Sequence, residues 1–137
     1  MKKEKSCGAI IFRKHQKNLE FVIIKQKHGF FFGFPKGHVE PDENEVETAR
    51  REVMEEVGLD VNIFEDIRGT INYEPKPGVS KEVVYFLAEA KNKNITKQTS
   101  EIDLAFWVKE DKVLKTLTYD SDKKLFKNFL SKAFKHK

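Results

Sequence analysis

The stretch GHVEPDENEVETARREVMEEVGL, residues 37–59, decides the fold of this chain. Apolar residues in it fall on one side of a helix turned by 100° per residue: Val46, Ala49, Val53 and Val57. Asn44 or Asp42 is suited to the N-cap, and Gly58 to the left-handed residue that ends a helix. The stretch therefore predicts a helix that packs its valine side against a sheet.

A second side of this helix carries acidic residues: Glu45, Glu52 and Glu56, with Glu55 beside them. Residues three or four apart on a helix face each other, so these like charges lie about 5–6 Å apart and cost about 0.2–0.5 kcal/mol per pair. A solvated acidic surface is one interpretation. The other is a metal site, because Mg²⁺ is held by a few carboxylates while substrate phosphates and water complete its coordination.

The spacing of particular residue types favours the metal site. Gly37 is followed after five residues by Glu43, and after seven more by the run REVMEEVGL, residues 51–59. This arrangement resembles the signature of the Nudix hydrolases. The resemblance implies an α/β fold, an α/β/α sandwich around a mixed β-sheet, and metal-assisted hydrolysis of a nucleoside diphosphate linked to another group.

The resemblance also implies roles for individual residues. The ligands implied for Mg²⁺, or alternatively Mn²⁺, are four acids: Glu52, Glu55, Glu56 and, from a segment distant in sequence, Glu101. Glu52 and Glu55 are both candidates for the catalytic base, and the choice between them stays open. The residues implied to be structural are Gly37, Glu43, Arg51 and Gly58. Of these, Gly37 is expected where the backbone turns tightly.

Segments outside this signature are similar to one branch of the family, the hydrolases that cleave diadenosine tetraphosphate asymmetrically to ATP and AMP. The segments are CGAIIF (7–12), FPKGHVEP (34–41), INYEP (71–75), KEVVYFLAEAK (81–91), Glu101–Trp107 and LTYDSDK (117–123). That branch commonly has a Trp where Phe32 stands, so an aromatic ring is retained. The likeness implies a small nucleotide substrate, diadenosine tetraphosphate.

A tetraphosphate bridge carries about four negative charges and needs cations. Lys36 and His38 flank Gly37 in the segment leading to the acidic helix, and we expect both to meet a phosphate. Lys81 is a further candidate, as is Lys76, with ordinary surface lysines as the alternative. The Tyr85 phenol can also contact phosphate, although its alternation along a strand with Val83 and Leu87 favours packing.

A purine base needs a flat surface, and stacking on an aromatic ring is worth about 1–3 kcal/mol. Tyr73 and Tyr119 are the candidates, because both lie at the ends of expected elements beside polar turn residues. Both also match aromatic positions that the similar branch uses around the base. Packing in the core is the alternative for each.

Composition sets the outer limits. The 137 residues fit one domain, residues 1–137, and the net charge of +4 suits an anionic partner. No apolar stretch reaches the roughly 18 residues that span a bilayer, so we expect a cytoplasmic protein that does not enter a membrane. Cys7, the one cysteine, excludes an internal disulfide and is expected in a buried strand. The sequence leaves the oligomeric state open, with a monomer favoured.

Charge is unevenly distributed. More than half of the 22 acidic residues lie between Glu40 and Glu74, whereas residues 123–137 carry six lysines and no acid. The lysine-rich segment is interpreted as a solvated helix face, with an RNA-binding surface as the alternative. The alternative functions are therefore hydrolysis of RNA 5′-triphosphate ends or nucleoside triphosphates, and a nucleotide-binding sensor without turnover.

Hydrophobic patterning predicts the remaining elements. The expected strands cover residues 6–12, 20–26, 61–73, 79–90 and 104–108, and the expected helices cover residues 109–117 and 120–134. Residues 28–37, HGFFFGFPKG, combine three glycines and a proline with four phenylalanines. We expect this segment to be a binding loop without regular structure, lying over the core.

Overall fold

The computed structural model describes residues 2–97 and 100–134, and a mixed seven-stranded sheet is its centre. The strands are β1 (Lys2–His15), β2 (Asn18–Gln26), β3 (Phe32–Gly33), β4 (Lys36–His38), β5 (Val61–Lys76), β6 (Val79–Ala90) and β7 (Ile102–Lys109). Five of them run in the order β3-β2-β1-β6-β5, while β4 pairs with β1 and β7 pairs with β2. Only β1 and β6 pair in parallel among the described strands.

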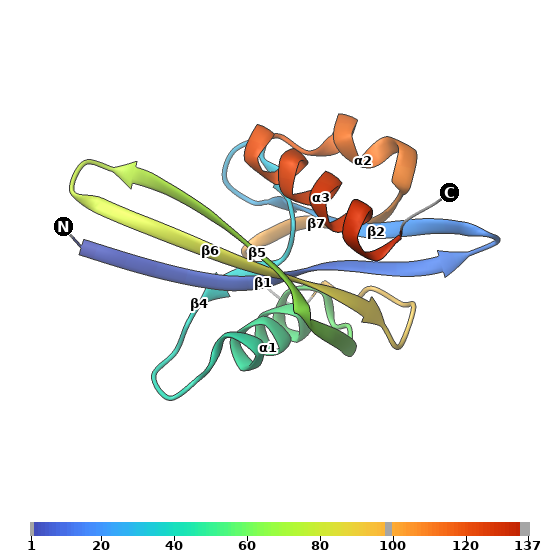
Figure 1. Ribbon diagram of the computed structural model, residues 1–137, viewed down its shortest axis with the longest axis horizontal. Helices are drawn as coiled ribbons and strands as arrows, with labels where there is room; N and C mark the ends of the chain where they lie inside the picture. Colours follow the sequence, from blue (N-terminus) through green and yellow to red (C-terminus); the bar gives the residue numbers. More distant parts are fainter. Residues whose placement is uncertain (1, 98–99, 135–137) are drawn as a thin grey trace.

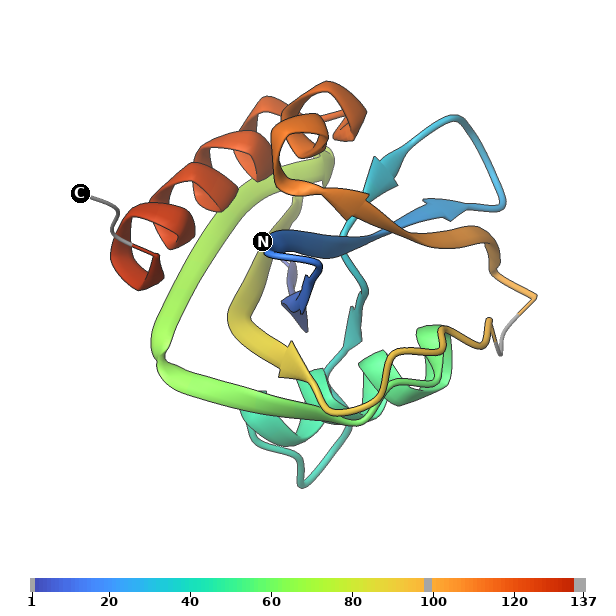
Figure 2. The same cartoon turned by 90° about the vertical axis from the view of Figure 1, so that its right-hand side faces the viewer.

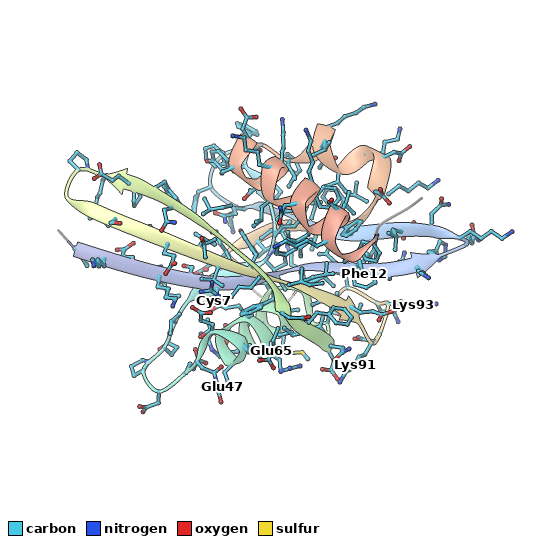
Figure 3. All side chains as sticks on the ribbon, in the orientation of Figure 1. Cys7, Phe12, Glu47, Glu65, Lys91 and Lys93 are labelled. Atoms are coloured by element: carbon cyan, nitrogen blue, oxygen red, sulfur yellow. The ribbon has the colours of Figure 1, made fainter. Side chains whose placement is uncertain are left out.

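Helices cover both faces of the sheet, as Figure 1 shows. Helix α1 (Glu45–Val57) lies on one face, and α2 (Glu110–Thr116) and α3 (Asp120–Ala133) lie on the other. Because side chains alternate along a strand, β1 supplies both cores. Cys7 is buried with the α1 layer, and Phe12 is buried with the α3 layer (Figure 3). The expected α/β/α sandwich and the buried Cys7 are confirmed.

Helix α1 forms as its sequence predicts. Asn44 is the N-cap: its side chain accepts a hydrogen bond from the Glu47 backbone N–H, and the Glu47 carboxylate accepts one from the Asn44 N–H. Gly58 ends the helix in the left-handed conformation, with φ of 68°. Val53 and Val57 are fully buried against the sheet. The competing cap, Asp42, lies outside the helix.

Residues 28–37 differ from expectation, because short strands form in them. Both β3 and part of β4 lie in this segment, so the prediction that it lacks regular structure is wrong. Strand β4 pairs with β1 at Gly8, where a Cβ would overlap the Pro35 carbonyl and Lys36. Because Gly8 of β1 has no side chain, β4 approaches β1 closely and pairs with it, despite the glycines and the proline in residues 28–37.

The long strand β5 is bent, and its curve is visible in Figure 2. Its pairing with β6 shifts register between Phe64 and Arg68 and again between Tyr73 and Lys76. Such irregularities bend a strand, and β5, at the edge of the sheet beside β6, makes contacts with α3. No helix of the described residues has the length and apolar character required to cross a membrane.

Candidate active site

Strand β4 brings the loop segment against the acidic side of α1. A Cβ at Gly37 would overlap the Glu52 carboxylate, so any side chain there would have to displace that carboxylate. The backbone N–H of Lys36 donates a hydrogen bond to Glu56 Oε1 over 3.3 Å. Gly37 does not adopt a positive φ, so its expected role in a tight turn is wrong. Glycine at this position instead lets the Glu52 carboxylate lie against the β4 backbone, in the space that a Cβ would fill.

Arg51 connects the loop to the helix. Its Nε donates to Glu43 Oε2 over 2.6 Å, and its Nη2 donates to the backbone carbonyl of His38 over 3.0 Å. Its Nη1 lies 2.8 Å from Glu52 Oε2 and 3.2 Å from Glu55 Oε1. The guanidinium lowers the pKa of Glu43 to about 2, so Glu43 stays ionised. Arg51 thereby fixes the positions of its acidic neighbours.

Burial and mutual repulsion define the electrostatics of α1. Glu56 is 9 % exposed, and burial, followed by the charge of Glu52, raises its pKa to about 8. Burial also raises the pKa of Glu52. Glu101, from the segment before β7, adds repulsion at both carboxyls, which places its charge close to them although it is far away in sequence. Burial and mutual repulsion of these carboxylates cost electrostatic free energy, and a bound cation would remove that cost.

Oxygen donors of this kind fit a hard divalent cation, although their present conformation is not a closed cage. Within residues 2–97 and 100–134, no three acidic, histidine or cysteine side chains lie close enough together to hold a metal ion. Glu55 is turned outward to Arg51 and is more than half exposed. The donors nevertheless match the chemistry of Mg²⁺, because it binds carboxylate oxygens, and the carboxylates of Glu52 and Glu101 repel the charge of Glu56.

An aromatic cavity of about 400 Å³ lies on the opposite face of the sheet, under the start of α3. Tyr73 and Tyr119, the two tyrosines expected to bind a base, line it and are 45 % and 48 % exposed. Tyr119 stacks on Phe31, with ring centroids 5.3 Å apart. Tyr85 lines the interior and is fully buried beside Phe34. The cavity offers flat apolar surfaces of the size that a purine requires.

The predicted phosphate-binding residues are not all placed alike. Lys36 lines the aromatic cavity, while its backbone contacts Glu56. Lys81 is half-buried opposite Tyr73, and burial, with Lys36 nearby, lowers its pKa. His38 and Lys76 are exposed and do not line the cavity. Lys36 therefore contacts both the acidic side of α1 and the cavity, and Lys81 lies close to Lys36.

The chain is similar to known proteins over most of its length. The NUDIX domain model matches residues 2–129. The chain belongs to the Nudix family. Several hydrolases of this family are similar to 74–91 % of the chain, so the protein is an enzyme of the hydrolase class.

Two relatives and one crystal structure are similar to this Nudix hydrolase over most of its length. The asymmetrical bis(5′-nucleosyl)-tetraphosphatase of Mus musculus is 38 % identical over 114 residues, 74 % of this chain and 76 % of its own length. The Caenorhabditis elegans protein of the same name is 31 % identical, covering 91 % and 93 %. A crystal structure of a C. elegans Ap4A hydrolase binary complex has a TM-score of 0.85 at 29 % identity, covering 93 % and 96 %.

The cavity residues of this Nudix protein that were not singled out from the sequence include Asp122 and Phe31, which lies in the segment expected to be a binding loop. Phe31 lies in a run of three phenylalanines between glycines, which is more aromatic surface than a short segment can bury. Asp122 shares the buried side of α3 with Phe126 and Phe129, at helical spacing. An acid in line with two core aromatics is the signal that would have found it.

Proposed function

We propose that this Nudix hydrolase cleaves dinucleoside polyphosphates, with diadenosine tetraphosphate as its substrate and ATP and AMP as products. The observation that carries the proposal is the position of Lys36: its backbone bonds to Glu56 while its side chain lines the aromatic cavity. A ligand with phosphates at α1 and a base in the cavity would span both sites. The tetraphosphatases named above supply the substrate class.

The acids of α1 are proposed to hold Mg²⁺ or Mn²⁺. The ligands would be Glu52, Glu55, Glu56 and Glu101. A divalent cation bound there supplies charge neutralisation at the phosphates and acidifies a bound water. Burial of Glu56, with its pKa near 8, favours a proton on its carboxyl in the absence of positive charge, so cation binding would release that proton. Either Glu52 or Glu55 would accept the proton of the attacking water.

The remaining residues orient the substrate. Arg51 keeps Glu52 and Glu55 beside the loop, and Gly37 leaves space for the Glu52 carboxylate. Lys36 and Lys81 would neutralise phosphate charge, and Tyr73 with Tyr119 would stack on one adenine. Water would attack the phosphorus atom bonded to one adenosine. The bond from that phosphorus to the oxygen bridging to the next phosphate would break, which gives AMP, and the other three phosphates would leave as part of ATP.

The test is a substrate panel in ¹⁸O-labelled water with Mg²⁺. The panel contains diadenosine tetraphosphate, nucleoside triphosphates, ADP-ribose and RNA with a 5′-triphosphate. The proposal requires the tetraphosphate to give the highest kcat/KM, with equal amounts of ATP and AMP and the label in AMP. Faster turnover of the RNA or of a triphosphate would transfer the assignment to that substrate.

A further inference from the structure

A buried acid lies among the aromatic residues that line the cavity. Asp122 is 8 % exposed and lines the cavity together with Tyr73 and Tyr119. In the part of the chain that the structure describes, its carboxylate makes no hydrogen bond and no ion pair. No side-chain oxygen sealed from solvent lacks a partner among those residues, so the carboxylate is reached through the cavity. A buried carboxylate without a protein partner is costly, and a ligand that donates hydrogen bonds would offset that cost.

Helix α3 does not account for the burial of this acid. Asp122 is in the first turn of α3, where an acid interacts favourably with the helix dipole, but its side chain makes no cap hydrogen bond. The exposed Asp120 is in the same turn and provides the same interaction without being buried. The position of Asp122 therefore points to a role toward a ligand in the cavity.

Asp122 is a neighbour both of the expected base surface and of an expected phosphate-binding lysine. Tyr119 precedes it by three residues, so the two side chains lie beside each other at the start of α3. A Cβ at Gly33 would lie 3.4 Å from Asp122 Oδ2, which places the carboxylate against β3, three residues before Lys36. Burial raises the pKa of Asp122 to about 6, and the charge of Lys36 opposes this rise, so the Lys36 ammonium group lies near the carboxylate.

This position matches the sugar of a bound nucleotide. The ribose is the part of a nucleotide that joins the base to the phosphates. With a base against Tyr73 and Tyr119 and phosphates at Lys36, the ribose would lie beside Asp122. The edge of adenine is a poorer match for this acid, because its amino group donates a hydrogen bond but the adjacent N1 accepts one and would face a carboxylate oxygen.

We propose that Asp122 is a specificity-determining residue that accepts hydrogen bonds from the ribose hydroxyls of the adenine nucleotide in the cavity, so that the protein prefers ribonucleotides to deoxyribonucleotides. The proposal rests on the proposed function only in that an adenine nucleotide enters this cavity. A carboxylate accepts hydrogen bonds at both oxygens, and the 2′- and 3′-hydroxyls each donate one. Acidic side chains recognise ribose hydroxyls in this way in dinucleotide-binding folds.

The test measures the binding of three adenine nucleotides to the full chain by calorimetry: ATP, 2′-deoxy-ATP and 3′-deoxy-ATP. EDTA prevents turnover, and pH 8 keeps Asp122 ionised, since its pKa is about 6. Wild type is expected to bind at least one of the deoxynucleotides about tenfold or more weakly than ATP, because a hydrogen bond to a charged acceptor is lost. The base and the triphosphate are the same in all three ligands, so the difference reports the hydroxyl alone.

Variants show whether the preference depends on the carboxylate. Asp122→Ala should lower the affinity for ATP to about that of the deoxynucleotide, without lowering the affinity for the deoxynucleotide itself. Asp122→Asn retains an amide oxygen as acceptor and should keep only part of the preference. Asp120→Asn, which removes a charge from the exposed side of the same turn, should behave as wild type. Thermal melts of all three check folding, and the wild-type comparison does not depend on any variant.

Two outcomes overturn the proposal. One is equal affinity of the wild type for the three nucleotides. The other is a preference for ATP that is as large in Asp122→Ala as in wild type, whether or not binding weakens as a whole, since the carboxylate would then contact the base or act only on the structure. Failure of the proposed function has a different signature, which is hydroxyl-dependent binding in EDTA without tetraphosphate turnover in Mg²⁺.

Discussion

The two faces of the sheet differ in how their candidate sites are built from the sequence. On the α1 face, acidic groups lie on consecutive turns of one helix, where local geometry fixes their spacing. On the α3 face, the cavity takes side chains from the loop before β3, from β5 and β6, and from the turn before α3. The α1 carboxylates are therefore spaced by local helix geometry, whereas the cavity, which we propose to hold a base, is assembled from distant segments. Strand β4 joins the two.

The largest effect on turnover should come from removing a carboxylate on the acidic side of α1. Glu56→Gln removes the most buried carboxylate of the proposed metal site and should lower kcat by about 10³-fold or more, as for loss of a charge that stabilises a transition state. Steady-state turnover with saturating Mg²⁺ measures it. Glu65→Gln, an exposed acid labelled in Figure 3, is the control and should retain wild-type turnover. Wild-type turnover in Glu56→Gln would remove this residue from the site.

A smaller effect is expected at the contact between β4 and α1. Gly37→Ala should push the Glu52 carboxylate aside and reduce kcat by about 10²-fold, the effect of displacing a reacting group by about 1 Å. The melting temperature should change little, because the end of a flexible side chain can move. In contrast, Gly8→Ala meets backbone at Pro35 and Lys36, so its melting temperature should fall clearly. If Gly37→Ala unfolds the protein instead, the glycine is needed for folding rather than for catalysis.

The cavity side should respond in KM rather than in kcat. Tyr73→Ala removes one stacking surface and should raise KM for diadenosine tetraphosphate about tenfold with kcat nearly unchanged. Tyr73→Phe keeps the ring and serves as the matched variant, with KM near that of wild type. Equal KM values for wild type, Ala and Phe would place the base outside this cavity.

The smallest effect concerns stability and pH. Because the folded-state pKa of Asp122, about 6, lies above its ordinary value of 3.8, stability is lost as pH rises from about 4 to 6 and stays lost above that range. Asp122→Asn should therefore raise the free energy of unfolding by about 1–3 kcal/mol at pH 8 and leave it nearly unchanged at pH 4. Urea unfolding at the two pH values measures this. A variant less stable than wild type at pH 8 would mean that the ionised carboxylate has a stabilising partner.

Sequence reasoning found the features that depend on neighbours along the chain. Asn44, Gly58 and the valine side of α1 follow from capping and helical periodicity, and β6 was predicted with its observed bounds. Tyr73 and Tyr119 were predicted as a pair and do line one cavity. Strands β5, β1 and β7 are longer than predicted, since pairing extends a strand beyond its apolar centre.

The failures came from contacts between distant segments. The short strands β3 and β4 exist because β2 and β1 offer them partners, which local propensity does not reveal. The reason for Gly37 is a carboxylate from α1, a contact that the local sequence does not reveal. His38 is exposed and lies outside the cavity, and its contact with a phosphate stays a prediction. Of the lysine-rich segment, residues 135–137 lie outside the described residues, while Lys124 and Lys127 are exposed on α3, as a solvated face requires.

The central claim is that the acids of α1 and the aromatic cavity form one site for one nucleotide. A crystal structure with Mg²⁺ and a non-hydrolysable analogue of diadenosine tetraphosphate tests it most directly. The account predicts an ion bound to Glu52 and Glu56, phosphates passing Lys36, and one base between Tyr73 and Tyr119. A base bound elsewhere, or Glu52 and Glu56 without an ion while the analogue is bound, would contradict it.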